Sequence, residues 1–260
     1  MIKTILYNFG LVFLFLEVTS ALKITNLNVP SAYILDDTSD ELEPLVLDCE
    51  YEIDDSGSGF VLKWLLNDFP IYQWIPSKKP HVMQSFKGRV DTEYSVSDDR
   101  LHKFSSLSII KPELNMTGNY ACSVQTYFEH DKQSKHLVII SPEREFNMSS
   151  TKENNGSTVI SCSVRDIYPE PDLILLLDDT EIDDIEPQIV KNENGFFDIS
   201  LTHALEPDQS EASIKCKLTI LNTNYTKIRD EMYHGNANSI QLISIFFLTI
   251  LSLLAQRFLH

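Results

Sequence analysis

Basic residues are scarce in this sequence, which has 21 lysines and arginines against 38 aspartates and glutamates and a formal net charge of −17. So acidic a surface repels phosphate groups, which argues against nucleic acid and the anionic face of a membrane as partners. The charge balance favours solubility and, where a partner is charged, a partner with a basic surface.

The short motifs of common enzymes and metal sites are also missing. There is no GxSxG and no HExxH, and the seven histidines are scattered along the chain. The close CxxC or CxH pairs that a zinc site needs are absent. Two acidic runs, residues 36–41 and 178–186, lack the ligand spacing of an EF-hand loop and are interpreted as solvated turns. We therefore expect no catalysis, no cofactor and no bound metal.

Long apolar runs occur at the two ends of the chain. Lys3, an apolar run and then Ser20 form the layout of a secretory signal peptide, residues 1–20. Residues 240–255 are almost wholly apolar, just short of the roughly 17–25 residues that span a bilayer. For residues 240–260 the sequence leaves open a lipid-anchor signal cleaved near Gly235 or Asn236, which we favour, and a short single span. Either alternative attaches the protein to the extracellular face of the plasma membrane.

Only four cysteines are present, at positions 49, 122, 162 and 216. In a secreted chain an even count suggests disulfides, and four cysteines allow three connectivities. If each pair lies inside one domain, the spacing pairs Cys49 with Cys122 and Cys162 with Cys216.

Alternating residues predict half-buried strands around the first cysteine pair, in "LVLDCEY", "FVLKWLL" and "GNYACSVQT". Cysteine, then tryptophan, then Tyr-x-Cys is the order typical of an immunoglobulin sandwich. In that fold the two cysteines join the two sheets and Trp64 packs on the bridge. The hydroxyl of Tyr120 is expected to bond back to nearby backbone. These residues hold the fold and carry no chemistry.

The long interval between Cys49 and Cys122 predicts a variable-type first domain, residues 21–141. It has room for extra strands, which "PIYQWIP" and "GRVDTEYSV" can fill. One position departs from the pattern: Met116 stands where the familiar corner has an aspartate. Arg89 is therefore expected to lack its usual partner.

The second domain, residues 142–227, keeps the bridge without the aromatic residues. Spacing places Leu175 at the tryptophan position and Ile214 at the tyrosine position. We interpret it as a divergent constant-type domain, followed by a stalk of residues 228–239. The predicted fold class is thus all-β, with two tandem immunoglobulin-like β-sandwiches.

Variable-type domains usually meet partners through the sheet of strands G, F, C and C′ and the loops at its end. The F–G loop, "TYFEHDK", offers Tyr127 and Phe128 as exposed aromatic anchors. Tyr72 and Trp74 share one face of a neighbouring strand, and the sequence leaves open whether they belong to the interface or the core. By alternation from Trp64 and Cys122, the outward positions are Lys63, Leu65, Ser123 and Gln125.

Four Asn-x-Ser/Thr triplets lie outside the proposed core strands. On a chain with a signal peptide we expect them to be glycosylated at least in part. They begin at Asn115, Asn147, Asn155 and Asn224.

The first domain resembles the beaten path (Beat) family of insect immunoglobulin-superfamily proteins. The resemblance rests on "LVLDCEYEIDD", on "FVLKW" followed closely by "PIYQWIP", and on "FKGRVD" and "TGNYACSV". It covers residues 22–140 well and residues 142–221 loosely, and the family tends to have an aromatic where this chain has Leu65. Membership implies a cell-surface recognition protein of cell–cell contact or axon guidance, with heterophilic binding to immunoglobulin-superfamily receptors of the Sidestep type. The alternative is a secreted or surface carrier or immune-type binding protein without an adhesion role.

Overall fold

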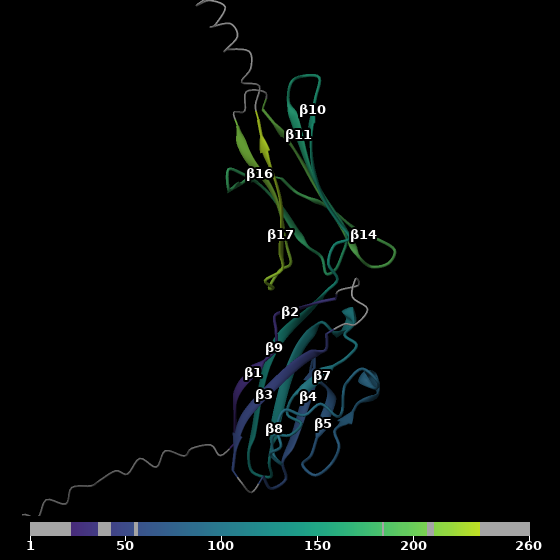
Figure 1. The fold of residues 1–260 in the computed structure, drawn as a ribbon, viewed down its shortest axis with the longest axis vertical. Coiled ribbons are helices and arrows are strands. Elements are labelled where there is room, and N and C mark those ends of the chain that lie inside the picture. The colour runs from purple at the N-terminus through teal and green to yellow at the C-terminus, as the bar shows by residue number, and fades with distance from the viewer. Residues whose placement is uncertain (1–21, 36–42, 55–56, 184, 207–210, 235–260) are drawn as a thin grey trace, which may run out of the picture.

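The computed structural model describes residues 22–35, 43–54, 57–183, 185–206 and 211–234. These residues form two β-sandwiches that lie end to end, the N-terminal one at the bottom of Figure 1. Within these ranges, no helix has the length and apolar character needed to cross a bilayer. The predicted signal peptide, the anchor region and the predicted cleavage positions Gly235 and Asn236 lie outside the described residues.

The first domain pairs a three-stranded sheet with a six-stranded one. The smaller sheet has the order β1 (Leu22–Asn28), β3 (Leu45–Ile53), β7 (Leu107–Ile109). The larger sheet has the order β2 (Ala32–Ile34), β9 (His130–Ile140), β8 (Gly118–Gln125), β4 (Val61–Leu66), β5 (Phe69–Trp74), β6 (His81–Val82). Two 3₁₀ turns, η1 (Gln84–Phe86) and η2 (Leu114–Met116), lie in the connections. The two extra strands beside β4 confirm a variable-type domain.

Two four-stranded sheets form the second domain. One has the order β10 (Glu145–Lys152), β11 (Thr158–Ile167), β15 (Phe197–Leu205), β14 (Gln188–Lys191). The other has the order β13 (Thr180–Glu181), β12 (Asp172–Leu177), β16 (Ala212–Thr219), β17 (Thr226–Tyr233). Strand β16, and β11 as far as Val164, bury every second residue, because each sheet presents one face to the core and the other to solvent.

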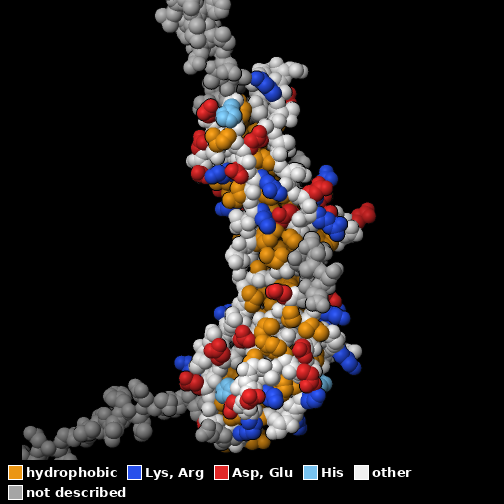
Figure 2. Space-filling model, viewed as in Figure 1, with side chains coloured by type: hydrophobic (Ala, Val, Ile, Leu, Met, Phe, Trp, Pro, Cys, Tyr) orange, Lys and Arg blue, Asp and Glu red, His pale blue; other side chains and the backbone are white. Residues whose placement is uncertain are grey.

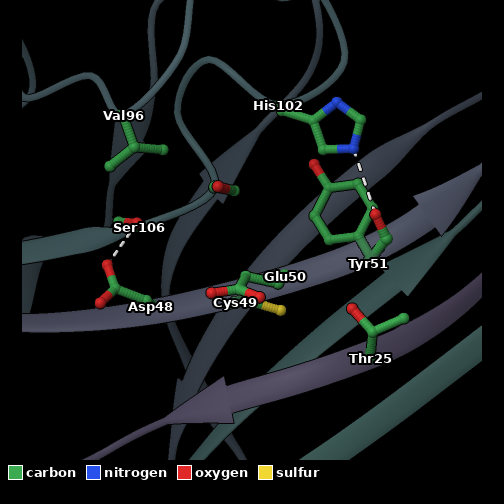
Figure 3. A pocket seen from close by; sticks show the side chains of 9 residues that line it. Thr25, Asp48, Cys49, Glu50, Tyr51, Val96, His102 and Ser106 are labelled. Atoms are coloured by element: carbon green, nitrogen blue, oxygen red, sulfur yellow. Dashed lines mark hydrogen bonds between the residues drawn. The ribbon is translucent and has the colours of Figure 1, made fainter.

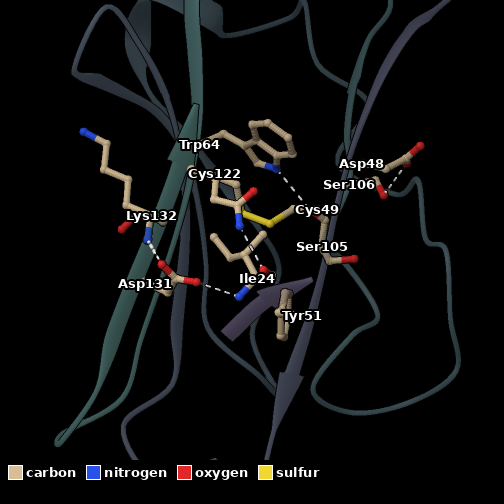
Figure 4. The surroundings of a disulfide bond; sticks show 12 residues. Ile24, Asp48, Cys49, Tyr51, Trp64, Ser105, Ser106, Cys122, Asp131 and Lys132 are labelled. Atoms are coloured by element: carbon tan, nitrogen blue, oxygen red, sulfur yellow. Dashed lines mark hydrogen bonds between the residues drawn. A yellow bond between two sulfur atoms is a disulfide. The ribbon is translucent and has the colours of Figure 1, made fainter. Parts of the chain in front are cut away.

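Both predicted disulfides are confirmed, Cys49–Cys122 with a sequence separation of 73 and Cys162–Cys216 with a separation of 54. In the first domain Trp64 is fully buried and lies directly opposite Cys122 in the β4–β8 register. Its indole Nε1 donates a hydrogen bond to the backbone oxygen of Ser105 at 3.0 Å (Figure 4). The bridge and the indole therefore occupy the centre of the sandwich together.

The tyrosine of the "NMTGNYAC" stretch also has the predicted role. The hydroxyl of Tyr120 donates to the backbone oxygen of Met116 at 2.9 Å, and the side chain is fully buried. Arg89 finds a different partner from the usual one, because its guanidinium lies 2.8 Å from the carboxylate of Glu113. Arg89 thus lacks its usual partner, as expected, and the carboxylate of Glu113, three positions before Met116, forms the ion pair instead.

Aliphatic residues replace these aromatics in the second domain. Leu175 lies opposite Cys216 in the β12–β16 register and is 2 % exposed. Ile214, two residues before that cysteine, is 1 % exposed. The sequence spacing thus placed both substitutions correctly.

Two expectations about the strands are wrong. Residues 88–96 do not form a strand, and only Val90 makes an isolated bridge, to Ile109. Residues 228–233 do not belong to a stalk, because they continue β17, which pairs with β16 along its whole length. Nearly every side chain of β17 is exposed, so the buried–exposed alternation that marks a half-buried strand is missing there.

Alternate side chains of β9 contribute to both hydrophobic cores. Leu137 and Ile139 belong to the first core, whereas Val138 and Ile140 belong to the second. Just beyond the strand, the backbone of Ser141 exchanges two hydrogen bonds with that of Tyr168, at 2.9 and 3.0 Å. The last strand of the first domain therefore runs into the second domain as a packed element. Figure 2 shows hydrophobic side chains between charged ones along both sandwiches.

We expect the buried tyrosines to make the first domain sensitive to alkali. Burial raises the pKa of Tyr51, Tyr72 and Tyr120 far above the ordinary value of about 10. At higher pH the unfolded chain loses these protons while the folded chain keeps them. The free energy of unfolding therefore has its full value below about pH 10 and decreases as the pH rises further. A titration of tyrosinate absorbance, with circular dichroism in parallel, should show at least three phenols that ionise only as the fold is lost. Ionisation of all phenols near pH 10 with the fold intact would contradict this.

Candidate recognition surface

One end of the first domain, here called the apical end, gathers the loops that could meet a partner. Register shows this directly, because Val61 at the start of β4 lies opposite Gln125 at the end of β8. Leu62 of the same strand lies opposite Trp74 at the end of β5. The loops that precede β4, follow β5 and follow β8 therefore emerge together, as they do at the binding end of variable domains.

The loop after β8 holds the two predicted aromatic anchors at its tip. Tyr127 is 78 % exposed and Phe128 is 90 % exposed, which confirms their predicted exposure. Their rings lie edge to face with centroids 6.5 Å apart. Large exposed aromatics are unusual on a surface and common in interfaces, because they bury much area at a low cost in side-chain entropy.

Local hydrogen bonds give this loop a defined shape. The backbone nitrogen of Thr126 donates to the oxygen of Glu129 at 2.8 Å, which closes the turn. The hydroxyl of Thr126 accepts from the backbone nitrogens of Phe128 and Glu129 at 3.3 and 3.1 Å. A turn held in this way presents its two rings with little conformational freedom left to lose on binding.

Gly59 supports the loop from the neighbouring connection. The backbone nitrogen of Tyr127 donates to the oxygen of Ser58 at 3.2 Å, and the phenol ring lies directly over Gly59. A Cβ atom at position 59 would lie 2.6 Å from the ring, and the glycine has a φ of +74°. Only glycine satisfies both the left-handed backbone and the close approach. The ring of Tyr127 can therefore pack directly on the backbone of Gly59, because that residue has no side chain.

The outer face of the larger sheet carries the remaining predicted positions. Lys63, Ser123 and Lys132 form one cross-strand row, and Val61, Gln125 and His130 form the next. Lys63 and Gln125 are half-buried, but Ser123 is only 8 % exposed. Its hydroxyl lies 3.1 Å from Nε2 of His130, which helps to cover it. The alternation predicted the direction of these side chains correctly, and only the exposure of Ser123 is lower than expected.

The open alternative for Tyr72 and Trp74 is decided in favour of the core. Tyr72 is 2 % exposed and Trp74 is 1 % exposed. The Tyr72 hydroxyl donates to the backbone oxygen of Phe104 at 3.0 Å. These residues are therefore wrong as surface anchors, and they act by supporting the strand beneath the apical loops. A register shift between Trp64 and Leu65 in the β4–β5 pair puts Ile71 in the core as well.

All four sequon asparagines have exposed side chains. Asn115 lies in η2, Asn147 on the edge strand β10, and Asn155 in the turn that joins β10 to β11. Asn224 lies in the connection before β17. Each is accessible to a glycan, and glycosylation itself stays a prediction.

An acidic hollow of about 420 Å³ lies beside β3 (Figure 3). Asp48 and Glu50 line it, but their carboxylates already accept hydrogen bonds from Ser106 at 2.7 Å and Asn26 at 3.4 Å. On its rim the Asp99 carboxylate lies 2.6 Å from Nδ1 of His102, and this hydrogen bond lowers the pKa of Asp99. Among the described residues no group of three or more potential metal ligands occurs.

Known proteins share the fold more clearly than the sequence. No protein-family model matches the chain. The chain is 28 % identical over 158 residues to Protein turtle of Drosophila melanogaster, a match that covers 54 % of this chain and 10 % of that protein. The chain thus spans about a tenth of the curated relative. A crystal structure of bovine butyrophilin superposes with a TM-score of 0.56 at 16 % identity, covering 79 % of this chain and 95 % of the other. This likeness, together with the two bridged sandwiches, shows the immunoglobulin fold.

Reasoning from the sequence missed a cluster of basic residues beside Trp74. The run "SKK" after β5 and the run "RLHK" before β7 come together there, although they are more than twenty positions apart. Basic runs usually mark a solvated surface, and nothing in the spacing of these two indicates that they meet. Only the three-dimensional structure brings them together.

Proposed function

We propose that this chain is an extracellular recognition protein that binds another immunoglobulin-superfamily protein through the apical end of its first domain. The observation that carries the proposal is the exposed pair Tyr127 and Phe128 on a hydrogen-bonded loop of a variable-type domain. An aromatic pair presented by a rigid turn has the features of an interface hot spot. The two disulfides agree with an oxidising, extracellular compartment.

The finer assignment follows the resemblance of the first domain to the beaten path family. On this basis the partner is a Sidestep-type receptor on another cell, and the contact serves adhesion or axon guidance. Neither of the known proteins matched above bears that family name, so the assignment stays a proposal. The proposed attachment is a lipid anchor near Gly235 or Asn236. Release of the protein from expressing cells by a phosphatidylinositol-specific phospholipase would support the anchor, and retention with residues 240–260 still attached would favour a span.

A binding screen is the direct test. Residues 21–235 are presented as a multimer to the extracellular immunoglobulin-family proteins of the same organism. A single partner or one related group of partners would support heterophilic recognition. Binding to small molecules alone would favour the carrier alternative.

Alanine at Tyr127 or Phe128 is expected to weaken binding to the identified partner by more than about 1 kcal/mol each. Each substitution removes a ring that would be buried against the partner in the complex. Neither ring packs in the hydrophobic core, so the fold should be unaffected. The measurement is the equilibrium dissociation constant by surface plasmon resonance, with the unfolding transition recorded for each variant.

Phe69→Ala provides the matched control. Phe69 is an equally exposed ring, 76 % accessible, and it lies opposite Leu66 at the far end of the same sheet from Trp74. Its loss should leave the affinity unchanged. If Tyr127→Ala/Phe128→Ala secretes normally and binds as well as the native protein, the loop is not the recognition element.

A further inference from the structure

A second hollow, of about 330 Å³, lies at the apical end beside the last residue of β5. Two segments that are distant in the sequence meet there, one directly after β5 and one shortly before β7. The residues that line it are Trp74, Ser77, Lys78, Lys79, Arg100, Lys103 and Phe104.

The charge of this hollow is opposite to that of the protein. Four of its seven lining residues are basic, in a chain with only 21 basic residues among 260 and a net charge of −17. Lys79 is paired with Glu93 at 2.7 Å, and Nζ of Lys103 lies 5.5 Å from the centre of the Phe104 ring. The carboxylate of the adjoining Asp99 is engaged by His102. None of the seven lining residues is acidic, so the lining itself carries a net positive charge, which attracts an anion.

The indole of Trp74 supplies an independent indication of a ligand. Trp74 is 1 % exposed, and its Nε1 is the one buried side-chain nitrogen or oxygen without a hydrogen-bond partner in the described part of the chain. Tryptophan offers a donor and no acceptor, and a buried donor left unsatisfied destabilises the fold. Trp64, by contrast, donates to Ser105. The single unsatisfied group therefore belongs to a residue that lines the basic hollow.

We propose that this hollow binds a sulfated sugar unit of an extracellular glycan, through its sulfate or carboxylate group. Lysine, arginine and indole side chains are donors only, so the complementary group carries acceptors only. The volume is at the lower end of the range for small-molecule sites, which fits one sugar unit against the rings of Trp74 and Phe104. The acidic surface around the hollow opposes a long polyanion and favours a short anionic segment. This site goes beyond the protein partner proposed above and does not depend on Tyr127 or Phe128.

The probe is a heparin-derived tetrasaccharide, added to the purified mature protein with ¹⁵N-labelled tryptophan. The chain contains two tryptophans, so two indole N–H resonances report on the first domain. We expect the tetrasaccharide to shift the resonance of Trp74 and to leave that of Trp64 in place. The chemically desulfated tetrasaccharide should shift neither resonance. Higher salt should weaken binding, because the contacts are ionic.

Lys78→Ala is expected to weaken binding of the tetrasaccharide about tenfold, because it removes a charge-assisted contact. Lys135→Ala is the matched control: it removes the same charge from an exposed position opposite Tyr120, toward the other end of the sheet from Trp74. An unchanged Trp64 resonance verifies that each variant is folded. The proposal is overturned if sodium sulfate alone binds as tightly, if the desulfated sugar binds equally, or if Lys135→Ala has the same effect as Lys78→Ala.

Discussion

Replacing Trp64 with alanine is expected to lower the free energy of unfolding of the first domain by about 3–5 kcal/mol. The indole is fully buried against the disulfide, so its removal leaves a cavity in the centre of the sandwich. It also leaves the backbone oxygen of Ser105 without its donor. Small domains are stable by only about 5–15 kcal/mol, so the variant is expected to be marginally folded.

Tryptophan fluorescence in increasing denaturant gives a selective measurement, because both tryptophans lie in the first domain. In Trp64→Ala the remaining Trp74 reports the transition. Leu175→Ala, at the equivalent position opposite Cys216, should leave this signal unchanged, since it weakens only the second domain. A loss below about 1 kcal/mol for Trp64→Ala would mean that the core collapses around the missing ring.

Two milder variants separate the ring from its hydrogen bond. Trp64→Phe removes both area and a donor, whereas Trp74→Phe removes area and a donor that has no partner in the ligand-free protein. We expect Trp64→Phe to destabilise the domain more, by roughly the 0.5–1.5 kcal/mol that a satisfied hydrogen bond contributes.

The parts of the fold that follow from the sequence are those in which chemistry and spacing coincide. The order of cysteine, tryptophan and Tyr-x-Cys places the bridge and the core of the first domain. The same spacing locates Leu175 and Ile214, even though neither is aromatic. Alternation also gives the direction of Lys63 and Gln125, because successive side chains of a strand point to opposite faces.

The parts that do not follow depend on long-range pairing. Strand β17 has no buried face, so no alternation marks it, and only its pairing with β16 makes it a strand. Tyr72 and Trp74 alternate with a polar residue, and either face fits the pattern until the position of the opposite sheet is known. The basic hollow is assembled from two loops, and its effect depends on a three-dimensional arrangement that neither segment encodes alone.

The second large effect concerns the bridge of the second domain. Replacing both Cys162 and Cys216 with alanine is expected to unfold that domain, whereas the same change at Cys49 and Cys122 leaves a weakened but folded first domain. Loop length does not make the difference. For separations of 73 and 54 residues, the chain-entropy model assigns each bridge roughly 4 kcal/mol, and the two values differ by only about 0.3 kcal/mol.

The difference comes from the cores that remain. Among the buried, described members of the second core, only Phe146 and Tyr225 are aromatic. The first core buries seven aromatic side chains: Tyr51, Phe60, Trp64, Tyr72, Trp74, Phe86 and Tyr120. Each such ring buries about 150–250 Å² and contributes several kcal/mol of apolar burial. The second domain thus depends more on its covalent link, because Leu175 and Ile214 replace the two aromatics that would otherwise pack beside it.

Hydrogen exchange with mass spectrometry measures both domains in one experiment. For the variant without Cys162 and Cys216, we expect protection to disappear from β11 and β16 and to persist in β4 and β8. The fluorescence of the two tryptophans serves as an internal control, since it should stay native in this variant. The opposite result would be that the second domain keeps its protection without its bridge, while the variant without Cys49 and Cys122 loses the protection of β4 and β8. In that case the aromatic core is not what stabilises the first domain when its bridge is removed.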